Sequence, residues 1–230
     1  HPYCGDDSEK RLVPVPGEDF PVFLEHRCAS LLELLLKRVK AGERIVPVSG
    51  WRSRTEQRKI YEDTAAEKGL AFTEKYVARP GHSEHQTGLA IDLAERKPSI
   101  DFVCPDFPYH GICQEFRRQA PAWGFIERYP RDKEAVTGIG WEPWHFRYVG
   151  FPHALIMSRE ALALEEYHVF LKEHPWGRPL VFETGSHWIE ISYIEALPGG
   201  RLPPLSLPSP HLISGNNVDG FVATVWRQKA

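Results

Sequence analysis

The segment FLEHRCASLLELLLKRVKAG, residues 23–42, constrains the fold of this chain more than any other stretch. Its apolar residues recur at helical spacing: Phe23, Leu24, Cys28, Leu31, Leu32, Leu35, Leu36 and Val39. The spacing predicts a long amphipathic helix that ends at Ala41-Gly42. Since 42% of the 230 residues are hydrophobic, the chain can bury a substantial core.

Shorter periodic segments follow this helix. The predicted strands are residues 44–49, 88–94, 125–129 and 144–150. Ser53 and Glu56 form a capping box that starts a second helix. Helical spacing recurs in residues 113–124, where Pro121 interrupts it, and in residues 154–172. Helices first, then strands separated by helices and loops, predict an α+β fold with a small, mostly antiparallel sheet flanked by helices.

The composition changes after residue 174. Pro and Gly crowd the stretches HPWGRP, LPGGRLPPLSLPSP and SGNNVDG, which separate the strand-like stretches HWIEISYI and FVATVW. We therefore predict two parts, residues 1–174 as the main domain and residues 175–230 as a small β-rich C-terminal extension.

The charge balance and the hydropathy exclude some partners. The chain has 28 basic and 31 acidic side chains, without a basic stripe, so neither nucleic acid nor an anionic membrane surface is indicated as a partner. No apolar run reaches the roughly 18 residues that a membrane-spanning helix needs. Because the sequence begins with His1, we expect that an upstream segment (a signal, an anchor or a tag) has been removed.

The four cysteines leave the redox compartment open. Cys4, Cys28, Cys104 and Cys113 form no C-x-x-C pair, which argues against a thiolate zinc knuckle. Two sequence-local disulfides, Cys4–Cys28 and Cys104–Cys113, are one interpretation, and free thiols are the other.

Most of the eleven histidines have no motif around them, but two do. His145 closes E-P-W-H, with Glu142 three residues earlier, and His85 precedes Asp92 by seven residues with Gly88 between them. Two imidazole nitrogens and one carboxylate oxygen leave one tetrahedral position open, as in a catalytic zinc site, and a nearby carboxylate can take a proton from the metal's water. On spacing alone, a solvated loop and a core histidine remain the ordinary alternative.

A third candidate is Arg52 in SGWRSRTEQ, residues 49–57. An arginine after a strand end presents a planar fork for a substrate carboxylate or a developing oxyanion. The ordinary alternative is a surface arginine near the start of a helix.

Three motifs occur in one order along the chain. They are SGWRSRTEQ, PGHSEHQTGLAIDL and GFIERYPRDKEAVTGIGWEPWHFRYVG. Over roughly residues 45–151 they resemble the VanY/VanXY-type D-alanyl-D-alanine carboxypeptidases, which belong with lysostaphin-like enzymes and the hedgehog domain to a wider group of zinc peptidases. The family pattern S-x-H-x-x-G-x-A-x-D fits residues 83–92 without a gap. The resemblance implies the hedgehog/D-Ala-D-Ala metallopeptidase-like fold.

The resemblance also implies roles for the matched residues. His85, Asp92 and His145 are the implied Zn²⁺ ligands, and Glu142 is the implied catalytic base. Arg52 is implied to stabilise the oxyanion or hold the substrate. Substrate contacts are implied for Gln57, Ser83 and Trp144.

The chain departs mildly from the family pattern. Trp51 and Trp141 stand where Tyr is common, which would alter the pocket wall. His82 lies outside the pattern and is expected to line the cleft. The segment 97–113, between the two zinc motifs, is expected to form a wall of the pocket, and residues 175–230 are not part of the minimal family domain.

Three functions fit the resemblance. The first is a D,D-carboxypeptidase that removes the terminal D-Ala from peptidoglycan stem peptides or precursors ending in D-Ala-D-Ala, with dipeptidase activity as an extension. The second is an L,D-carboxypeptidase that acts on tetrapeptide stems. The third is a non-catalytic zinc-containing binding module, against which the intact Glu142 and Arg52 argue. The sequence leaves the location open between the cytoplasm and the extracytoplasmic side of the cell envelope, and we favour the latter.

Overall fold

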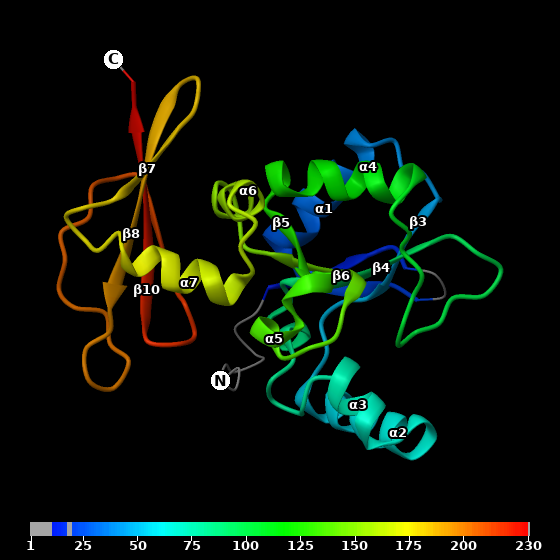
Figure 1. The fold of residues 1–230 in the computed structure, drawn as a ribbon. Coiled ribbons are helices and arrows are strands. Elements are labelled where there is room, and N and C mark those ends of the chain that lie inside the picture. The colour runs from blue at the N-terminus through cyan, green and yellow to red at the C-terminus, as the bar shows by residue number, and fades with distance from the viewer. Residues whose placement is uncertain (1–10, 18–19, 230) are drawn as a thin grey trace. The chain divides into compact units, whose positions relative to one another are not determined.

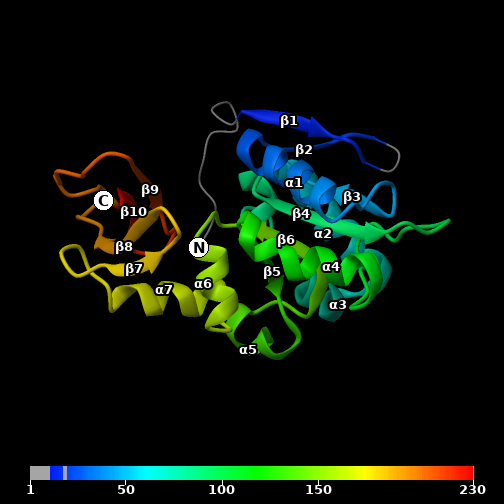
Figure 2. The same ribbon diagram turned by 90° about the horizontal axis from the view of Figure 1, so that it is seen from above.

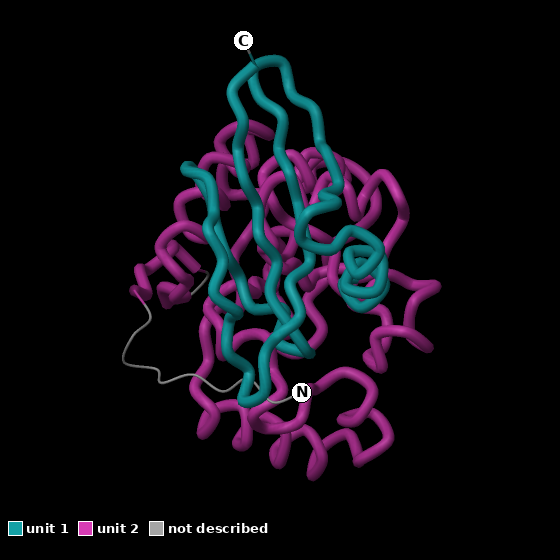
Figure 3. The backbone as a smooth tube through the Cα atoms, turned by 90° about the vertical axis from the view of Figure 1, so that its left-hand side faces the viewer, with its two compact units in different colours: residues 1, 164–230 teal, residues 2–163 magenta. Residues whose placement is uncertain are grey.

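The computed structural model describes residues 11–17 and 20–229, which divide into two compact units (Figure 3). Of the described residues, 11–17 and 20–163 form the first unit and 164–229 form the second. The second unit therefore begins with helix α7 (Leu164–Lys172), before the change in composition at residue 175.

The first unit is built around a four-stranded antiparallel sheet in the order β3-β4-β6-β5 (Figure 1). These strands are β3 (Ile45–Ser49), β4 (Ala90–Glu95), β6 (Glu142–Tyr148) and β5 (Phe125–Tyr129). All four lie at or within a few residues of the predicted strands, and the predicted α+β class with an antiparallel sheet is confirmed.

Helices lie on both sides of this sheet (Figures 1 and 2). On one side are α1 (His26–Arg38) and α4 (Gly111–Gln119), and on the other are α2 (Arg54–Lys68) and α3 (Leu70–Tyr76). The short helices of this unit are η2 (Glu84–Thr87), η3 (Ala120–Trp123), η4 (Arg131–Lys133), α5 (Glu134–Thr137) and α6 (His153–Arg159).

The hydrophobic core fills the space between the sheet and helices α1 and α4. Leu32 and Leu35 of α1 pack in one cluster with Phe116 of α4 and with Ile91 and Phe146 of the sheet. Because side chains alternate along a strand, the residues between these apolar positions point to the other face of the sheet. That second face of the sheet can therefore hold polar side chains without disrupting the hydrophobic core.

The helix predicted from Phe23 begins later than its apolar spacing indicates. Residues Val22–Glu25 form strand β2, which pairs with β1 (Leu12–Val15) in an antiparallel hairpin beside α1 (Figure 2). The Glu25 carboxylate accepts hydrogen bonds from the backbone N–H groups of Arg27 and Cys28, at 2.9 and 3.1 Å. This cap satisfies the first donors of α1 and starts the helix at His26.

The single helix predicted over residues 154–172 is wrong, because the structure contains two helices there, α6 and α7. Ala161 has φ of 52°, a left-handed conformation, and the N–H of Leu162 bonds back to the carbonyl of Met157 at 2.9 Å. This six-to-one bond is the Schellman arrangement that ends a helix. Its usual glycine is replaced by alanine here, so the sequence carried no stop signal.

The second unit confirms the predicted β-rich character of the C-terminal part. Its antiparallel sheet has the order β7-β8-β10-β9, with β7 (Leu180–Glu183), β8 (His187–Glu195), β9 (His211–Gly215) and β10 (Gly220–Gln228). Phe182, Ile189 and Ile191 are buried within this unit.

The cysteines that the structure describes are free thiols: Cys28 and Cys113 are buried, and Cys104 is partly buried. Of the two interpretations left open by the sequence, the structure therefore supports free thiols, because Cys104 and Cys113 form no disulfide; Cys4 lies outside the described residues. No helix within residues 11–17 and 20–229 is long and apolar enough to cross a membrane.

Candidate active site

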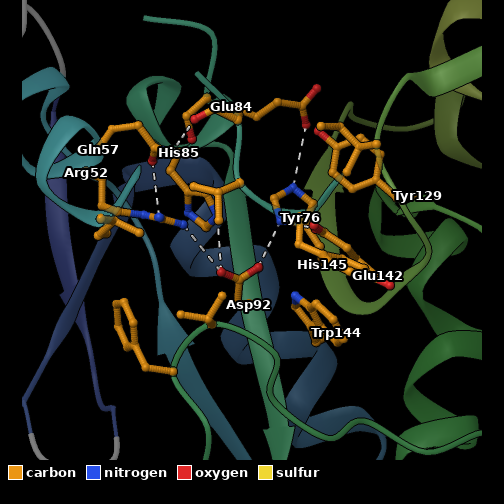
Figure 4. Close-up of a pocket in the computed structure, with 17 residues that line it drawn as sticks. Arg52, Gln57, Tyr76, Glu84, His85, Asp92, Tyr129, Glu142, Trp144 and His145 are labelled. Atoms are coloured by element: carbon orange, nitrogen blue, oxygen red, sulfur yellow. Dashed lines mark hydrogen bonds and ion pairs between the residues drawn. The ribbon is translucent and has the colours of Figure 1, made fainter. Parts of the chain in front are cut away.

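The candidate site lies on the face of the first sheet opposite the core (Figure 4). Asp92 of β4 and His145 of β6 are direct partners in the strand register. Their neighbours Ile91, Leu93 and Phe146 belong to the core, so the alternation turns Asp92 and His145 to the other side. Both side chains are nevertheless buried, under the residues that line a pocket.

His85 joins this pair from helix η2. Its Nδ1 lies 2.6 Å from the carbonyl oxygen of Gly50, and because a carbonyl only accepts, Nδ1 carries the hydrogen. The unprotonated Nε2 then faces Asp92 Oδ2 at 3.2 Å, while Nδ1 of His145 lies 2.8 Å from Asp92 Oδ1. One ligand atom from each of the three residues lies within 4.8 Å of the others. The structure thus brings together the three predicted metal ligands as a possible metal site.

Burial and neighbouring charges shift the pKa values in this cluster. Burial alone raises the pKa of Asp92, but the two histidines beside it outweigh burial and hold that pKa well below its usual range. Burial and the Arg52 charge lower the pKa of His85 to about 4. His85 is therefore neutral and Asp92 ionised at neutral pH, the forms that bind a cation. For His145, burial opposes the charged form, yet Asp92 raises its pKa to about 9.

Glu142, the predicted base, is the first residue of β6 and lines the same pocket. Its Oε2 lies 3.8 Å from His145 Nδ1, next to the possible metal site. Burial raises the pKa of Glu142 to about 8, although the His145 charge opposes this shift. A carboxyl group with a pKa near neutrality can both take and return a proton under ordinary conditions.

Arg52 and Gln57 form a linked pair at the side of the cluster. The Arg52 Nη2 atom lies 3.6 Å from Asp92 Oδ2, and its Nη1 donates to Gln57 Oε1 at 3.1 Å. Gln57 in turn donates from Nε2 to the carbonyl of Ala78 at 2.7 Å. Both ends of the Gln57 amide therefore bond to protein atoms, and this buried side chain holds the Arg52 guanidinium in place.

The remaining predicted residues are distributed as follows. Ser83 and Trp144 line the pocket with the ligands, and so do Phe102 and Val103 of the predicted wall segment 97–113. The other lining residues are Ile60, Tyr76, Val77, Ala78, Glu84, Tyr129 and Ile139. Over the part of the chain that the structure describes, Trp51, His82 and Trp141 are not among them. His82 is exposed, because Gly81 turns the chain before the buried Ser83.

Among the lining residues that were not singled out from the sequence, Tyr129 and Glu84 lie beside His145. Tyr129 is the register partner of Glu142, and its ring lies 5.0 Å from the His145 ring. Glu84 is buried between Ser83 and His85. In the sequence, Glu84 is distinguished only as an acidic residue inside the motif that contains Ser83 and His85. Tyr129 is the last residue of a predicted strand, and no other feature of the sequence distinguishes it.

Comparison with known proteins identifies proteins that are similar to this chain in sequence and structure. The family VanY, D-alanyl-D-alanine carboxypeptidase, matches residues 22–151. The bifunctional D-Ala-D-Ala dipeptidase and D-Ala-D-Ala carboxypeptidase VanXYC of Enterococcus gallinarum is 41% identical over 174 residues, covering 75% of this chain and 92% of the relative.

Solved structures give the same family. The vancomycin resistance D,D-dipeptidase VanXYg, in complex with a D-Ala-D-Ala phosphinate analog, is 49% identical with a TM-score of 0.91, covering 97% of this chain and 89% of that one. A mutant of the D,D-pentapeptidase VanY from the VanB-type resistance cassette, in complex with Zn(II), is 32% identical with a TM-score of 0.55, covering 70% of this chain and 90% of that one. With the family match covering more than half of its residues, this chain belongs to the VanY family of D-alanyl-D-alanine carboxypeptidases.

Proposed function

We propose that this protein is a zinc-dependent D,D-carboxypeptidase that removes the terminal D-Ala from peptidoglycan stem peptides or their precursors, and that it also hydrolyses D-Ala-D-Ala. The observation that carries the proposal is the convergence of His85, Asp92 and His145 in one pocket with Glu142 and Arg52. The relative VanXYC, a bifunctional dipeptidase and carboxypeptidase, supports both activities, and the D,D-dipeptidase VanXYg supports the second.

The donor set fits zinc. Two imidazole nitrogens and one carboxylate oxygen are a ligand set of catalytic zinc sites, which keep a further position open for water or substrate. The hydrogen bond from His85 Nδ1 to the Gly50 carbonyl leaves Nε2 of that ring as the donor. When bound, zinc supplies a Lewis acid for the scissile carbonyl and lowers the pKa of water.

The protein's own residues supply the proton transfer. Glu142 takes the proton of the attacking water at its carboxylate and passes it to the departing amine of D-Ala. Burial keeps the pKa of Glu142 at about 8, which suits both steps. None of the three cysteines that the structure describes, Cys28, Cys104 and Cys113, lines the pocket, so we expect water to be the nucleophile and no acyl-enzyme to form.

Arg52 supplies a fixed positive charge. Its guanidinium is held by Gln57 on one side and by the Asp92 carboxylate on the other. Such a preorganised donor stabilises the charge that develops on the carbonyl oxygen, and losing one donor of this kind costs about 10²–10³ in kcat. The apolar residues Phe102 and Val103 limit the space beside the cluster, which favours the small methyl side chain of D-Ala.

The decisive experiment compares substrates. Purified protein is loaded with zinc and incubated with pentapeptide stem, tetrapeptide stem and D-Ala-D-Ala, and the released D-Ala is measured with and without a chelator. We expect chelator-sensitive release from the pentapeptide and from the dipeptide. Release from the tetrapeptide alone would show an L,D-carboxypeptidase, and release from none of the three would favour a binding module.

A variant tests the role of Glu142. Replacing Glu142→Gln removes the base but keeps the size of the side chain, so we expect zinc to remain bound while kcat falls by about 10²–10⁴. Zinc content and D-Ala release are measured on the same preparation. Hydrolysis at the wild-type rate would overturn the assignment of the base.

A further inference from the structure

A buried carboxylate lies behind His145, on the side away from Asp92. Glu84 Oε2 is 3.8 Å from Nε2 of His145, and both side chains are almost fully buried, with 2% and 6% exposed (Figure 4). The pattern S-x-H-x-x-G-x-A-x-D leaves position 84 open, so the family resemblance assigns no role to this residue.

Two arginines hold Glu84 in place. Arg128 donates from Nε to Glu84 Oε1 at 2.8 Å, and Nη1 of Arg147 lies 3.2 Å from Glu84 Oε2. A buried carboxylate with two guanidinium partners stays ionised and has little freedom to rotate. Glu84 is therefore a fixed negative charge at the outer nitrogen of His145.

The two histidines of the site are anchored in related ways. The outer nitrogen of His85 bonds the Gly50 carbonyl, whereas the outer nitrogen of His145 faces the Glu84 carboxylate. The 3.8 Å separation is longer than a hydrogen bond, so Glu84 acts through its charge. An anion beside Nε2 favours the tautomer with its hydrogen on Nε2, and that tautomer leaves the lone pair on Nδ1, the atom that faces Asp92.

We propose that Glu84 is a positioning residue for metal binding, which keeps the hydrogen of His145 on Nε2 and presents Nδ1 to the metal. The proposal rests on the proposed zinc site. Outer partners of this type fix the ring of a ligating histidine and raise its basicity, and their loss typically costs 10–100-fold in metal affinity.

A matched pair of variants separates this role from that of an ordinary buried ion pair. Glu127 on β5 is a partly buried glutamate with its side chain 13% exposed, and its Oε2 lies 2.7 Å from Arg117 Nε. It is not among the residues that line the pocket in the described part of the chain. Replacing Glu84→Gln and Glu127→Gln removes one arginine-paired carboxylate in each case, but only the first change removes the charge beside His145.

The primary measurement is zinc affinity, by competition with a chromophoric chelator. We expect the zinc dissociation constant of Glu84→Gln to rise about 10–100-fold and that of Glu127→Gln to stay at the wild-type value. The absorption spectrum of the cobalt-substituted protein gives a second readout, because the ligand field changes with the orientation of His145. Partial recovery of zinc affinity in Glu84→Asp would support a role for the charge itself.

A charge-balanced variant serves as a control for the case in which Glu84→Gln fails to fold. If Glu84→Gln does not fold, the double change Glu84→Gln with Arg147→Gln removes one charge of each sign and is tested in its place. Wild-type zinc affinity in the variant that folds, or equal loss in Glu127→Gln, overturns the proposal. A wild-type protein that binds no zinc would instead overturn the proposed function.

Discussion

The two four-stranded antiparallel sheets of this protein bury different chemistry. The sheet β3-β4-β6-β5 contains the buried residues Asp92, Arg128, Glu142 and His145, whereas the buried polar residues described on the strands β7-β8-β10-β9 are Ser192 and Thr224. Burying a charge is costly unless it is paired or binds a ligand. The buried charged residues therefore indicate that the first sheet carries the functional site. The second sheet has the same number of strands but buries only uncharged polar residues on its described strands.

The largest effect is expected at the centre of the first sheet. Asp92 contacts His85, His145 and Arg52, so Asp92→Asn removes the charge of a proposed metal ligand and the common partner of these three residues. We expect zinc affinity to fall by more than the 10–100-fold typical of an outer partner, with D-Ala release falling in parallel. Chelator competition and D-Ala release measure the two effects.

The matching change in the second unit is Asp219→Asn. This aspartate pairs with Lys172, and its side chain is 37% exposed. We expect no change in zinc affinity or D-Ala release from it. Equal losses in the two variants would show that the contrast between the sheets does not identify the site.

An intermediate effect is expected from Gln57→Ala. The variant loses the bond that holds Arg52 and the bond to the Ala78 carbonyl, while the metal ligands remain. A misplaced guanidinium lowers kcat by about 10–100-fold, with zinc affinity unchanged. Steady-state kinetics on the pentapeptide checks this, and an increase in KM alone would show that Gln57 contacts the substrate instead of positioning Arg52.

The smallest effect on the site is expected from a change in the second sheet. Ile191 of β8 and Ile91 of β4 are both fully buried, so Ile191→Ala and Ile91→Ala each remove the same apolar group. Each is expected to cost about 2–5 kcal/mol in the free energy of unfolding of its own unit, measured with denaturant. Only Ile91→Ala is expected to weaken zinc binding, since Ile91 adjoins Asp92. Weaker zinc binding in Ile191→Ala would show that the second unit supports the site.

The sequence predicted the parts of the structure that leave a local mark. The stretch LAIDLA places a single charge among apolar residues, so both the strand and the unusual Asp92 could be read from it. The convergence of His85 with His145 followed from motifs in the order of a known family, not from spacing alone.

What the sequence did not predict depends on tertiary contacts. Phe23 and Leu24 fit helical spacing, but pairing with β1 places them in a strand. Ala161 ends a helix in a conformation that alanine rarely adopts, and the adjacent residues in the sequence do not predict this helix end. The role proposed for Glu84 depends on Arg128, which is distant in sequence and becomes a partner only when β5 joins the sheet.

The register between β4 and β6 links folding to site assembly. In the native register Asp92 faces His145 and Ile91 faces Phe146. A slip by one residue would turn His145 toward the apolar core and Phe146 toward the pocket, because side chains alternate along a strand. Burial of Phe146 thus favours the register in which the proposed metal ligands Asp92 and His145 meet.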